Sequence, residues 1–162
     1  MMNRFVSLVV ASLVLCAPAA AEEIRGKVVA IADGDTLTIL DARNDQHRVR
    51  LAGIDAPEKN QPFGNQSKQN LSRLVASKAI VADCYKIDRY QRRICRVFLD
   101  GVDVPLSQVT SGLAWWYRYY SNEQTAQERE TYERAESIAI ASRAGLWKDS
   151  NPVAPWDWRK SK

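Results

Sequence analysis

The chain is poor in histidine and lacks any long hydrophobic run. His47 is its only histidine, so a zinc site built from histidine and cysteine ligands has little support. The longest mainly apolar stretch, residues 5–16, is too short to span a bilayer. Internal repeats, low-complexity tracts and dividing linkers are also missing after residue 21, which favours one domain over an array.

The first 21 residues are typical of a secretory signal peptide. Residues 1–4 form a basic start, the apolar stretch follows, and residues 17–21 (APAAA) offer two small-x-small cleavage sites. A buried N-terminal helix and a lipoprotein anchor at Cys16 are the alternatives. We therefore expect cleavage near Ala21, export to the periplasm or the medium, and no membrane association of the mature chain.

Residues 22–162 are enough for one compact domain with a core. The net charge of the whole chain, +4, suits a polyanion binder but is common in basic enzymes of other kinds. We expect a domain over residues 22–150 and a tryptophan-containing C-terminal tail over residues 151–162. In that tail, Trp156 and Trp158 are expected to pack the C-terminus against the domain.

Two kinds of periodicity alternate along the expected domain. Short β-prone runs separated by turn residues predict strands, and apolar residues at helical spacing predict helices. In the last helix, the predicted buried face holds Tyr132, Ala135, Ile138, Ala139 and Ser142, with Gly145 as the C-terminal cap. The predicted strands are 24–31, 35–40, 46–52, 79–84 and 94–99, and the predicted helices are 64–77, 105–110 and 125–143.

This order of elements predicts an α+β fold. We expect a five-stranded antiparallel OB-type barrel with about three α-helices packed on it. A three-stranded sheet that is flanked by helices and never closes is the alternative. His47 is expected on an exposed strand face, without a catalytic role.

Two cysteines, Cys84 and Cys95, remain after residue 21, and an even pair in an exported protein favours a disulfide. If the loop between their strands centres between Arg89 and Tyr90, directly opposed residues have numbers that sum to 179. The two cysteines satisfy this sum, so a cross-strand Cys84–Cys95 disulfide is plausible.

Two acidic clusters lie at strand ends. Asp33 and Asp35 occupy the first turn, and Asp55 and Glu58 follow the third strand. A three-stranded meander brings these ends together, and converging carboxylates repel each other unless they share a cation. Oxygen ligands favour a hard divalent ion, and Ca²⁺ takes about six to eight of them at flexible geometry. The pattern predicts Ca²⁺, with Mg²⁺ as the alternative.

Two arginines accompany the acids: Arg50 lies on the incoming strand, and Arg92 lies in a later loop. Guanidinium groups bind phosphate bidentately and stabilise the charge of a pentacoordinate phosphorus. Glu58 is suited to take a proton from an attacking water. Each acidic cluster alone is more typical of an ordinary turn, but the combination predicts a phosphoryl-transfer site.

Three segments resemble the signature blocks of the staphylococcal nuclease (thermonuclease) family, in the family's order and at compatible spacing: residues 33–36 (DGDT), 50–58 (RLAGIDAPE) and 88–92 (DRYQR). Residues 111–114 (SGLA) and 145–147 (GLW) resemble further blocks. The likeness covers about residues 24–147.

The resemblance implies a role for each matched residue. Asp35 and Asp55 match calcium carboxylates, and Ala56 matches a ligand that contributes its backbone carbonyl. Arg50 and Arg92 match the phosphate-binding arginines, and Glu58 matches the general base. Catalytic residues are therefore expected at Arg50, Glu58 and Arg92, and metal ligands at Asp35, Asp55 and Ala56.

Aromatic residues suggest where bases bind. The run 115–120 (WWYRYY) can stack bases, or it can fill the core in part. Arg118 and Tyr120 lie close to where relatives place nucleotide-contacting tyrosines, and Tyr90 lies in the third block. We expect Tyr90, Arg118 and Tyr120 to bind substrate.

Two departures from the family pattern concern the Arg92 loop and the access of substrate. Gln91 stands where relatives usually carry glycine, so a requirement for positive φ there would strain or re-aim the Arg92 loop. Residues 59–67 also form a shorter segment than in the type enzyme.

The resemblance implies a monomeric, calcium-dependent nuclease that hydrolyses DNA and RNA with little sequence preference and leaves 3′-phosphate ends. The alternative is a catalytically silent OB-type module that binds nucleic acid or protein.

Overall fold

The computed structural model describes residues 22–161. The expected signal peptide, residues 1–21, lies outside the described residues. Between residues 22 and 161, no helix is both long enough and apolar enough to cross a membrane.

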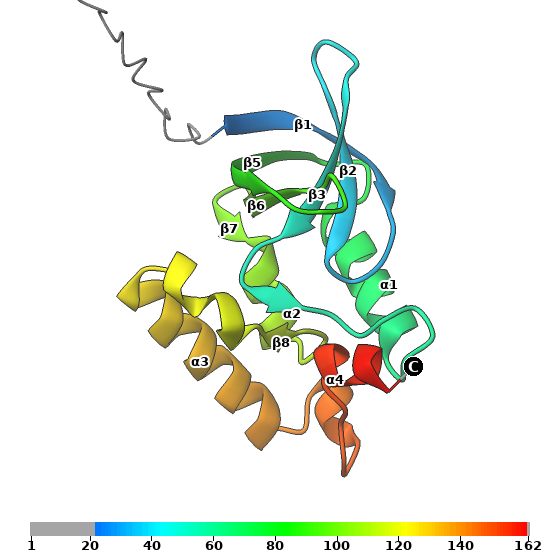
Figure 1. Cartoon of the computed structure of the whole chain (residues 1–162), viewed down its shortest axis with the longest axis vertical. Coiled ribbons are helices and arrows are strands. Elements are labelled where there is room, and N and C mark those ends of the chain that lie inside the picture. The colour runs from blue at the N-terminus through cyan, green and yellow to red at the C-terminus, as the bar shows by residue number, and fades with distance from the viewer. Residues whose placement is uncertain (1–21, 162) are drawn as a thin grey trace, which may run out of the picture.

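The predicted five-stranded barrel is confirmed, as Figure 1 shows in its upper half. Its strands pair in the ring order β1-β2-β3-β6-β5, with β5 returning to β1. The closing pair β3–β6 is parallel, and the other four pairs are antiparallel. A ring with an odd number of strands cannot alternate in direction throughout, so the all-antiparallel expectation fails at one pair. The strands are β1 (Glu22–Ile31), β2 (Thr36–Asp41), β3 (Gln46–Leu51), β5 (Ala79–Ile87) and β6 (Arg93–Leu99).

The three predicted helices are present, and the tail adds a fourth. In Figure 1, α3 lies below the barrel, and α4 lies beside the lower end of α1. The helices are α1 (Gly64–Val75), α2 (Val104–Thr110), α3 (Ala126–Ala141) and α4 (Pro155–Lys160), with 3₁₀ turns η1 (Arg118–Glu123) and η2 (Gly145–Lys148). The short strands are β4 (Ile54–Asp55), β7 (Val102–Asp103) and β8 (Trp115–Trp116).

The core fills the barrel and the space between the barrel and the helices. Leu37 and Ile39 of β2 and Val49 and Leu51 of β3 are fully buried, as the alternation of side chains along a strand requires. His47 shares this alternation and is buried, which corrects the expectation of an exposed histidine. Its Nε2 lies 2.9 Å from Asp41 Oδ2, and this hydrogen bond lowers the pKa of Asp41 to about 2.

The predicted buried face of α3 is partly wrong. Tyr132 and Ala139 are buried, but Ile138 is 59% exposed and Glu136 is buried instead. The Glu136 carboxylate accepts hydrogen bonds from the backbone N–H of Trp116 (2.9 Å) and from Arg118 Nη1 (2.6 Å). These partners offset the cost of burying its charge.

The structure contains the expected disulfide. Cys84 and Cys95 face each other across β5 and β6, with a Cα–Cα distance of 4.0 Å. A bulge between Cys84 and Lys86 shifts the pairing by one residue. The register assumed from the sequence therefore holds at the disulfide but not between the disulfide and the loop.

The two late sequence blocks contact each other. Gly112 and Gly145 both have positive φ, and the Leu146 N–H donates to the Gly112 carbonyl at 2.8 Å. A Cβ on Gly145 would lie 2.2 Å from that carbonyl oxygen, so a side chain cannot fit there. The left-handed residue closest to the end of α3 is Arg143, so Gly145 does not cap this helix, contrary to the prediction.

Candidate active site

The two acidic clusters converge at one end of the barrel. Asp35 follows β1, and its backbone carbonyl accepts from the Leu51 N–H at 2.8 Å. Its carboxylate Oδ2 accepts from the Ala56 N–H at 3.0 Å, which ties the first turn to the segment after β4. Asp55 itself lies in β4 and pairs with Trp115 of β8. Backbone pairing therefore determines where both acids lie.

Arg50 joins the two carboxylates. Its Nη2 lies 2.8 Å from Asp55 Oδ1 and 3.4 Å from Asp35 Oδ2. Its Nη1 donates to the carbonyls of Leu51 (3.3 Å) and Ile54 (3.1 Å). Burial alone would lower the pKa of Arg50, but the adjacent carboxylates raise it. The guanidinium is a fixed positive charge at the centre of the cluster.

The two acids of the first turn have pKa values shifted in opposite directions. Burial would raise the pKa of Asp35, but Arg50, the Ala56 N–H and the Thr36 hydroxyl lower it below its usual value. Burial and the Asp35 charge raise the pKa of Asp33 to about 6. Asp33 also lines the groove into which the side chains of this site point, and its Oδ1 accepts from the Asp35 N–H at 3.1 Å. No separate role for Asp33 was predicted from the sequence.

Position 34, between these two acids, requires glycine for a steric reason. A Cβ at that position would lie 1.8 Å from the Ser67 hydroxyl of α1, so the turn can lie against the helix only with glycine. The Gly34 carbonyl accepts from the buried Gln108 side chain at 2.7 Å.

Glu58 lies at the edge of the cluster, in the turn between β4 and α1. Its backbone N–H donates to the Gln61 side chain at 3.1 Å, and its carbonyl accepts from the Gln61 N–H at 2.9 Å. The carboxylate is partly exposed and accepts from Arg159 Nη1 at 2.7 Å. It is therefore accessible from the groove when that arginine moves.

Arg92 approaches the same groove from the β5–β6 loop. Asp88 holds it with its carboxylate, 2.8 Å from Arg92 Nε and 2.7 Å from Nη2. Its Nη1 points to the Thr36 hydroxyl at 3.4 Å. Gln91 has φ of +60°, so the loop does use the left-handed conformation at the position where relatives carry glycine.

One groove of about 790 Å³ collects these side chains. Tyr90 and Tyr120 line it, and Lys86 Nζ lies 4.4 Å from the centre of the Tyr120 ring. Arg118 is not among the lining residues, because its guanidinium packs over the Trp116 ring (4.2 Å) and pairs with Glu136. Among the predicted site residues, the groove is lined by Asp35, Arg50, Asp55, Ala56, Glu58, Tyr90, Arg92 and Tyr120.

Arg159 is a groove residue whose contact with the site was not predicted from the sequence. It comes from α4 and contacts Asp55, 104 residues earlier in the chain. No local pattern marks such a contact, because the tail carries no periodicity that relates it to the β4 turn. The packing of its tryptophans was expected, and Trp156 does stack on Tyr117, with ring centroids 5.1 Å apart.

The donor set fits a hard divalent cation. The carboxylates of Asp35 and Asp55 approach the same guanidinium nitrogen, so their oxygens lie close together. Within residues 22–161, no group of three or more His, Cys, Asp or Glu side chains is placed to hold a metal ion by itself. Two carboxylates would need backbone, water or phosphate oxygens to complete the shell, which suits Ca²⁺ better than zinc.

Comparisons with known proteins identify the family of this chain. A family model described as "Staphylococcal nuclease homologue" matches residues 48–149. A Haemophilus influenzae protein named "Uncharacterized endonuclease" is 43% identical over 136 residues, which cover 84% of this chain and 73% of the relative.

Two enterobacterial proteins are similar over most of their length. An Escherichia coli O157:H7 protein, also named "Uncharacterized endonuclease", is 35% identical over 162 residues, covering 99% of this chain and 100% of the relative. A Shigella flexneri protein named "Micrococcal nuclease" is 39% identical over 158 residues, covering 92% of this chain and 87% of the relative.

Proposed function

Because this chain belongs to the staphylococcal nuclease family and is a nuclease by that membership, we propose that it is a Ca²⁺-dependent phosphodiesterase of the micrococcal nuclease type. It hydrolyses DNA and RNA internally, with little sequence preference, and leaves 3′-phosphate ends. The observation that carries this proposal is the convergence of Asp35, Arg50, Asp55 and Glu58 in one groove.

The residues for the cation are Asp35, Asp55 and the backbone carbonyl of Ala56. Their oxygens are hard ligands, and waters and a substrate phosphate would complete the coordination. When bound, Ca²⁺ supplies positive charge to a phosphate oxygen. The hydrogen bond from the Ala56 N–H to Asp35 supports this set, because it keeps Ala56 beside the carboxylate.

Glu58 is the proposed general base. Its carboxylate is partly exposed at the edge of the groove, so a water beside a bound phosphate can reach it. The carboxylate takes a proton from that water as the water oxygen attacks phosphorus. Glu58 therefore has to be free of its ion pair with Arg159 at that moment. The P–O5′ bond breaks, the phosphate stays on the 3′ oxygen, and the 5′ oxygen leaves and takes up a proton as a hydroxyl.

Arg50 and Arg92 are the proposed phosphate-binding groups. Both guanidiniums line the groove, and each is paired with a carboxylate, Arg50 with Asp55 and Arg92 with Asp88. Fixed donors of this kind stabilise negative charge that grows on the phosphate oxygens. Tyr90 and Tyr120 are placed to stack on bases, and Arg118 remains a proposed contact from beside the groove.

The cellular setting is also a proposal. A cross-strand disulfide is typical of oxidising compartments, which supports export after cleavage near Ala21. We propose that the mature protein is monomeric and acts in the periplasm or outside the cell.

Replacing Glu58 with glutamine tests the mechanism. Without the base, Ca²⁺-dependent cleavage of plasmid DNA and of RNA is expected to fall by roughly 10²- to 10⁴-fold. The measurement is the initial rate with the mature protein in Ca²⁺, in Mg²⁺ and in EGTA. Because Glu58 is partly exposed, thermal stability should hardly change.

Glu133→Gln is the matched control, because Glu133 is an exposed glutamate of α3 outside the groove lining. It should cleave at the wild-type rate. A Glu58→Gln protein that keeps that rate would contradict the mechanism. A wild-type protein that binds nucleic acid in Ca²⁺ without cleaving it would support the silent binding module instead.

A further inference from the structure

The guanidinium of Arg159 covers the acidic cluster from α4. Its Nη2 donates to Asp55 Oδ2 at 2.7 Å, and its Nη1 lies 3.3 Å from Asp55 Oδ1. The same Nη1 donates to Glu58 Oε1 at 2.7 Å. One side chain thus pairs with a proposed metal ligand and with the proposed general base.

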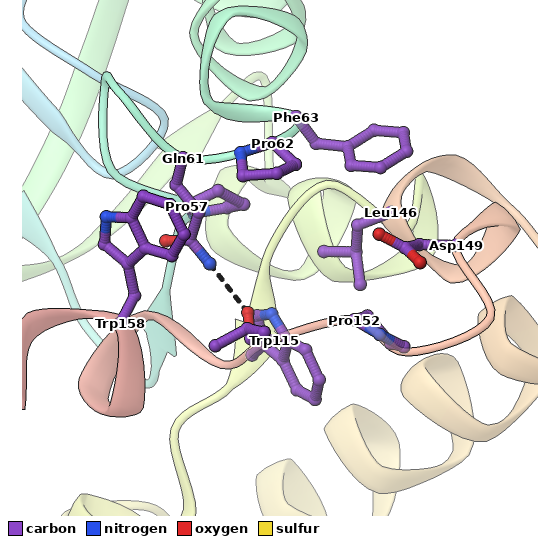
Figure 2. Close-up of a pocket in the computed structure, with 10 residues that line it drawn as sticks. Pro57, Gln61, Pro62, Phe63, Trp115, Leu146, Asp149, Pro152 and Trp158 are labelled. Atoms are coloured by element: carbon purple, nitrogen blue, oxygen red, sulfur yellow. Dashed lines mark hydrogen bonds between the residues drawn. The ribbon is translucent and has the colours of Figure 1, made fainter. Parts of the chain in front are cut away.

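The tail that carries Arg159 is docked by contacts of its own. Gln61 Nε2 donates to the Val153 carbonyl at 2.6 Å, drawn as a dashed line in Figure 2. Trp158 lies beside Pro57 in the same view, where both line a cavity of about 40 Å³. These contacts hold the tail against the segment between Asp55 and α1, so we expect α4 to stay in place when Arg159 is replaced.

Further aromatic contacts hold the start of α4. Trp156 stacks on Tyr117 with an interplanar angle of 10°, and its ring centroid lies 5.8 Å from that of Trp115. The position of the α4 backbone is therefore set by the fold, and α4 carries the Arg159 side chain to the edge of the groove.

Both oxygens of Asp55 are already engaged. Oδ1 accepts from Arg50, and the Arg159 guanidinium spans Oδ1 and Oδ2. A cation held by Asp55 would bring its charge to oxygens that a guanidinium already neutralises. Like charges repel at this range, and the buried Asp55 carboxylate has little solvent to screen them. Arg50 is anchored to two backbone carbonyls, whereas the Arg159 side chain is 43% exposed and can swing out.

We infer that Arg159 is a positioning residue that competes with the divalent cation for Asp55. It neutralises Asp55 and Glu58 in the cation-free protein, and it leaves Asp55 when the cation binds. Binding of the cation and release of the Glu58 carboxylate from its ion pair with Arg159 are thereby linked. This inference rests on the cation site of the proposed function.

Calorimetric titration with CaCl₂ tests the inference on the full mature chain, without substrate. Arg159→Gln removes the competing charge, so the dissociation constant for Ca²⁺ should fall by about fivefold, the size expected for one partly exposed ion pair. Arg159→Lys keeps the charge but loses the bidentate geometry. Its dissociation constant for Ca²⁺ should therefore lie between those of the wild type and Arg159→Gln. Circular dichroism checks that each variant is folded.

Lys160→Gln is the matched control. Lys160 carries the same charge on the next residue of α4 and pairs with Asp157 at 3.2 Å, away from Asp55 and Glu58. Its dissociation constant should stay within about twofold of wild type, because only an exposed charge is removed. Equal affinity in Arg159→Gln and Lys160→Gln overturns the inference, as does weaker binding in Arg159→Gln.

A parallel cleavage assay separates this inference from the proposed function. Wild-type cleavage of DNA in Ca²⁺, together with unchanged affinity in Arg159→Gln, overturns the inference alone. Tighter Ca²⁺ binding by Arg159→Gln in a protein that never cleaves supports the inference and overturns the nuclease proposal.

Discussion

The side chain of Arg50 shows how a single residue shapes the groove. It donates to two backbone carbonyls and contacts both Asp35 and Asp55, so its position is set from several sides. A lysine has the charge but lacks the planar fork that makes these contacts together. Arg92, in contrast, pairs with a single carboxylate, that of Asp88, and its other side-chain hydrogen bond, to the Thr36 hydroxyl, is long at 3.4 Å.

Gln91 is the residue that strains this loop. At its φ of +60°, a side chain costs roughly 1 kcal/mol relative to glycine. Gln91→Gly is therefore expected to raise the free energy of unfolding by up to about 1 kcal/mol, less a part lost to the more flexible unfolded chain. Urea denaturation measures the gain. Gln91→Ala keeps the strain and should show none, and equal stability of the two variants would contradict this explanation.

At the scale of elements, the disulfide joins β5 to the strand that closes the barrel. Cys95 pairs with Leu51 of β3, and its carbonyl accepts from the Ala52 N–H at 2.9 Å. The bond therefore lies next to the strand that carries Arg50. Its loss should affect stability first, because it touches none of the acids directly.

The two cysteines are 11 residues apart in the sequence, so opening the bond frees a short loop. The double variant Cys84→Ala/Cys95→Ala is expected to lose roughly 2–3 kcal/mol of unfolding free energy, measured by urea denaturation. Adding a reductant to the wild-type protein should lower its urea midpoint similarly and leave the double variant unchanged. A wild-type midpoint insensitive to reductant would count against a stabilising disulfide.

The groove is a property of the whole molecule. Its acids come from the β1–β2 turn and from β4, its second arginine from the β5–β6 loop, and Arg159 from the C-terminal helix. These segments meet only in the folded protein. A ligand that needs several of them must bind the folded state and stabilise it.

Calcium is therefore expected to raise the melting temperature. At a free Ca²⁺ concentration 100 times its dissociation constant, the stabilisation is about 2.7 kcal/mol. For a domain of this size, that corresponds to a shift on the order of 8 °C relative to EGTA. Differential scanning fluorimetry measures it. Glu58→Gln should keep most of the shift and Asp55→Asn should lose it; an equal shift in Asp55→Asn would place the bound ion elsewhere.

Local patterns in the chain were sufficient to predict the five barrel strands, helices α1 to α3 and the disulfide partners. Alternation and helical spacing act between near neighbours, so they are readable without a structure. The acidic and arginine blocks also predicted which side chains meet, because a three-stranded meander leaves little choice for its ends. Their catalytic and metal-binding roles remain predictions.

Long-range packing decided the rest. The parallel β3–β6 pair follows from closing five strands into a ring, and buried Glu136 displaces Ile138 because Trp116 and Arg118 supply its partners. The burial of His47 likewise depends on its pairing with Asp41. Arg159 reaches Asp55 only because α4 docks beside the β4 turn, and no spacing in the sequence encodes a contact between residues 104 positions apart.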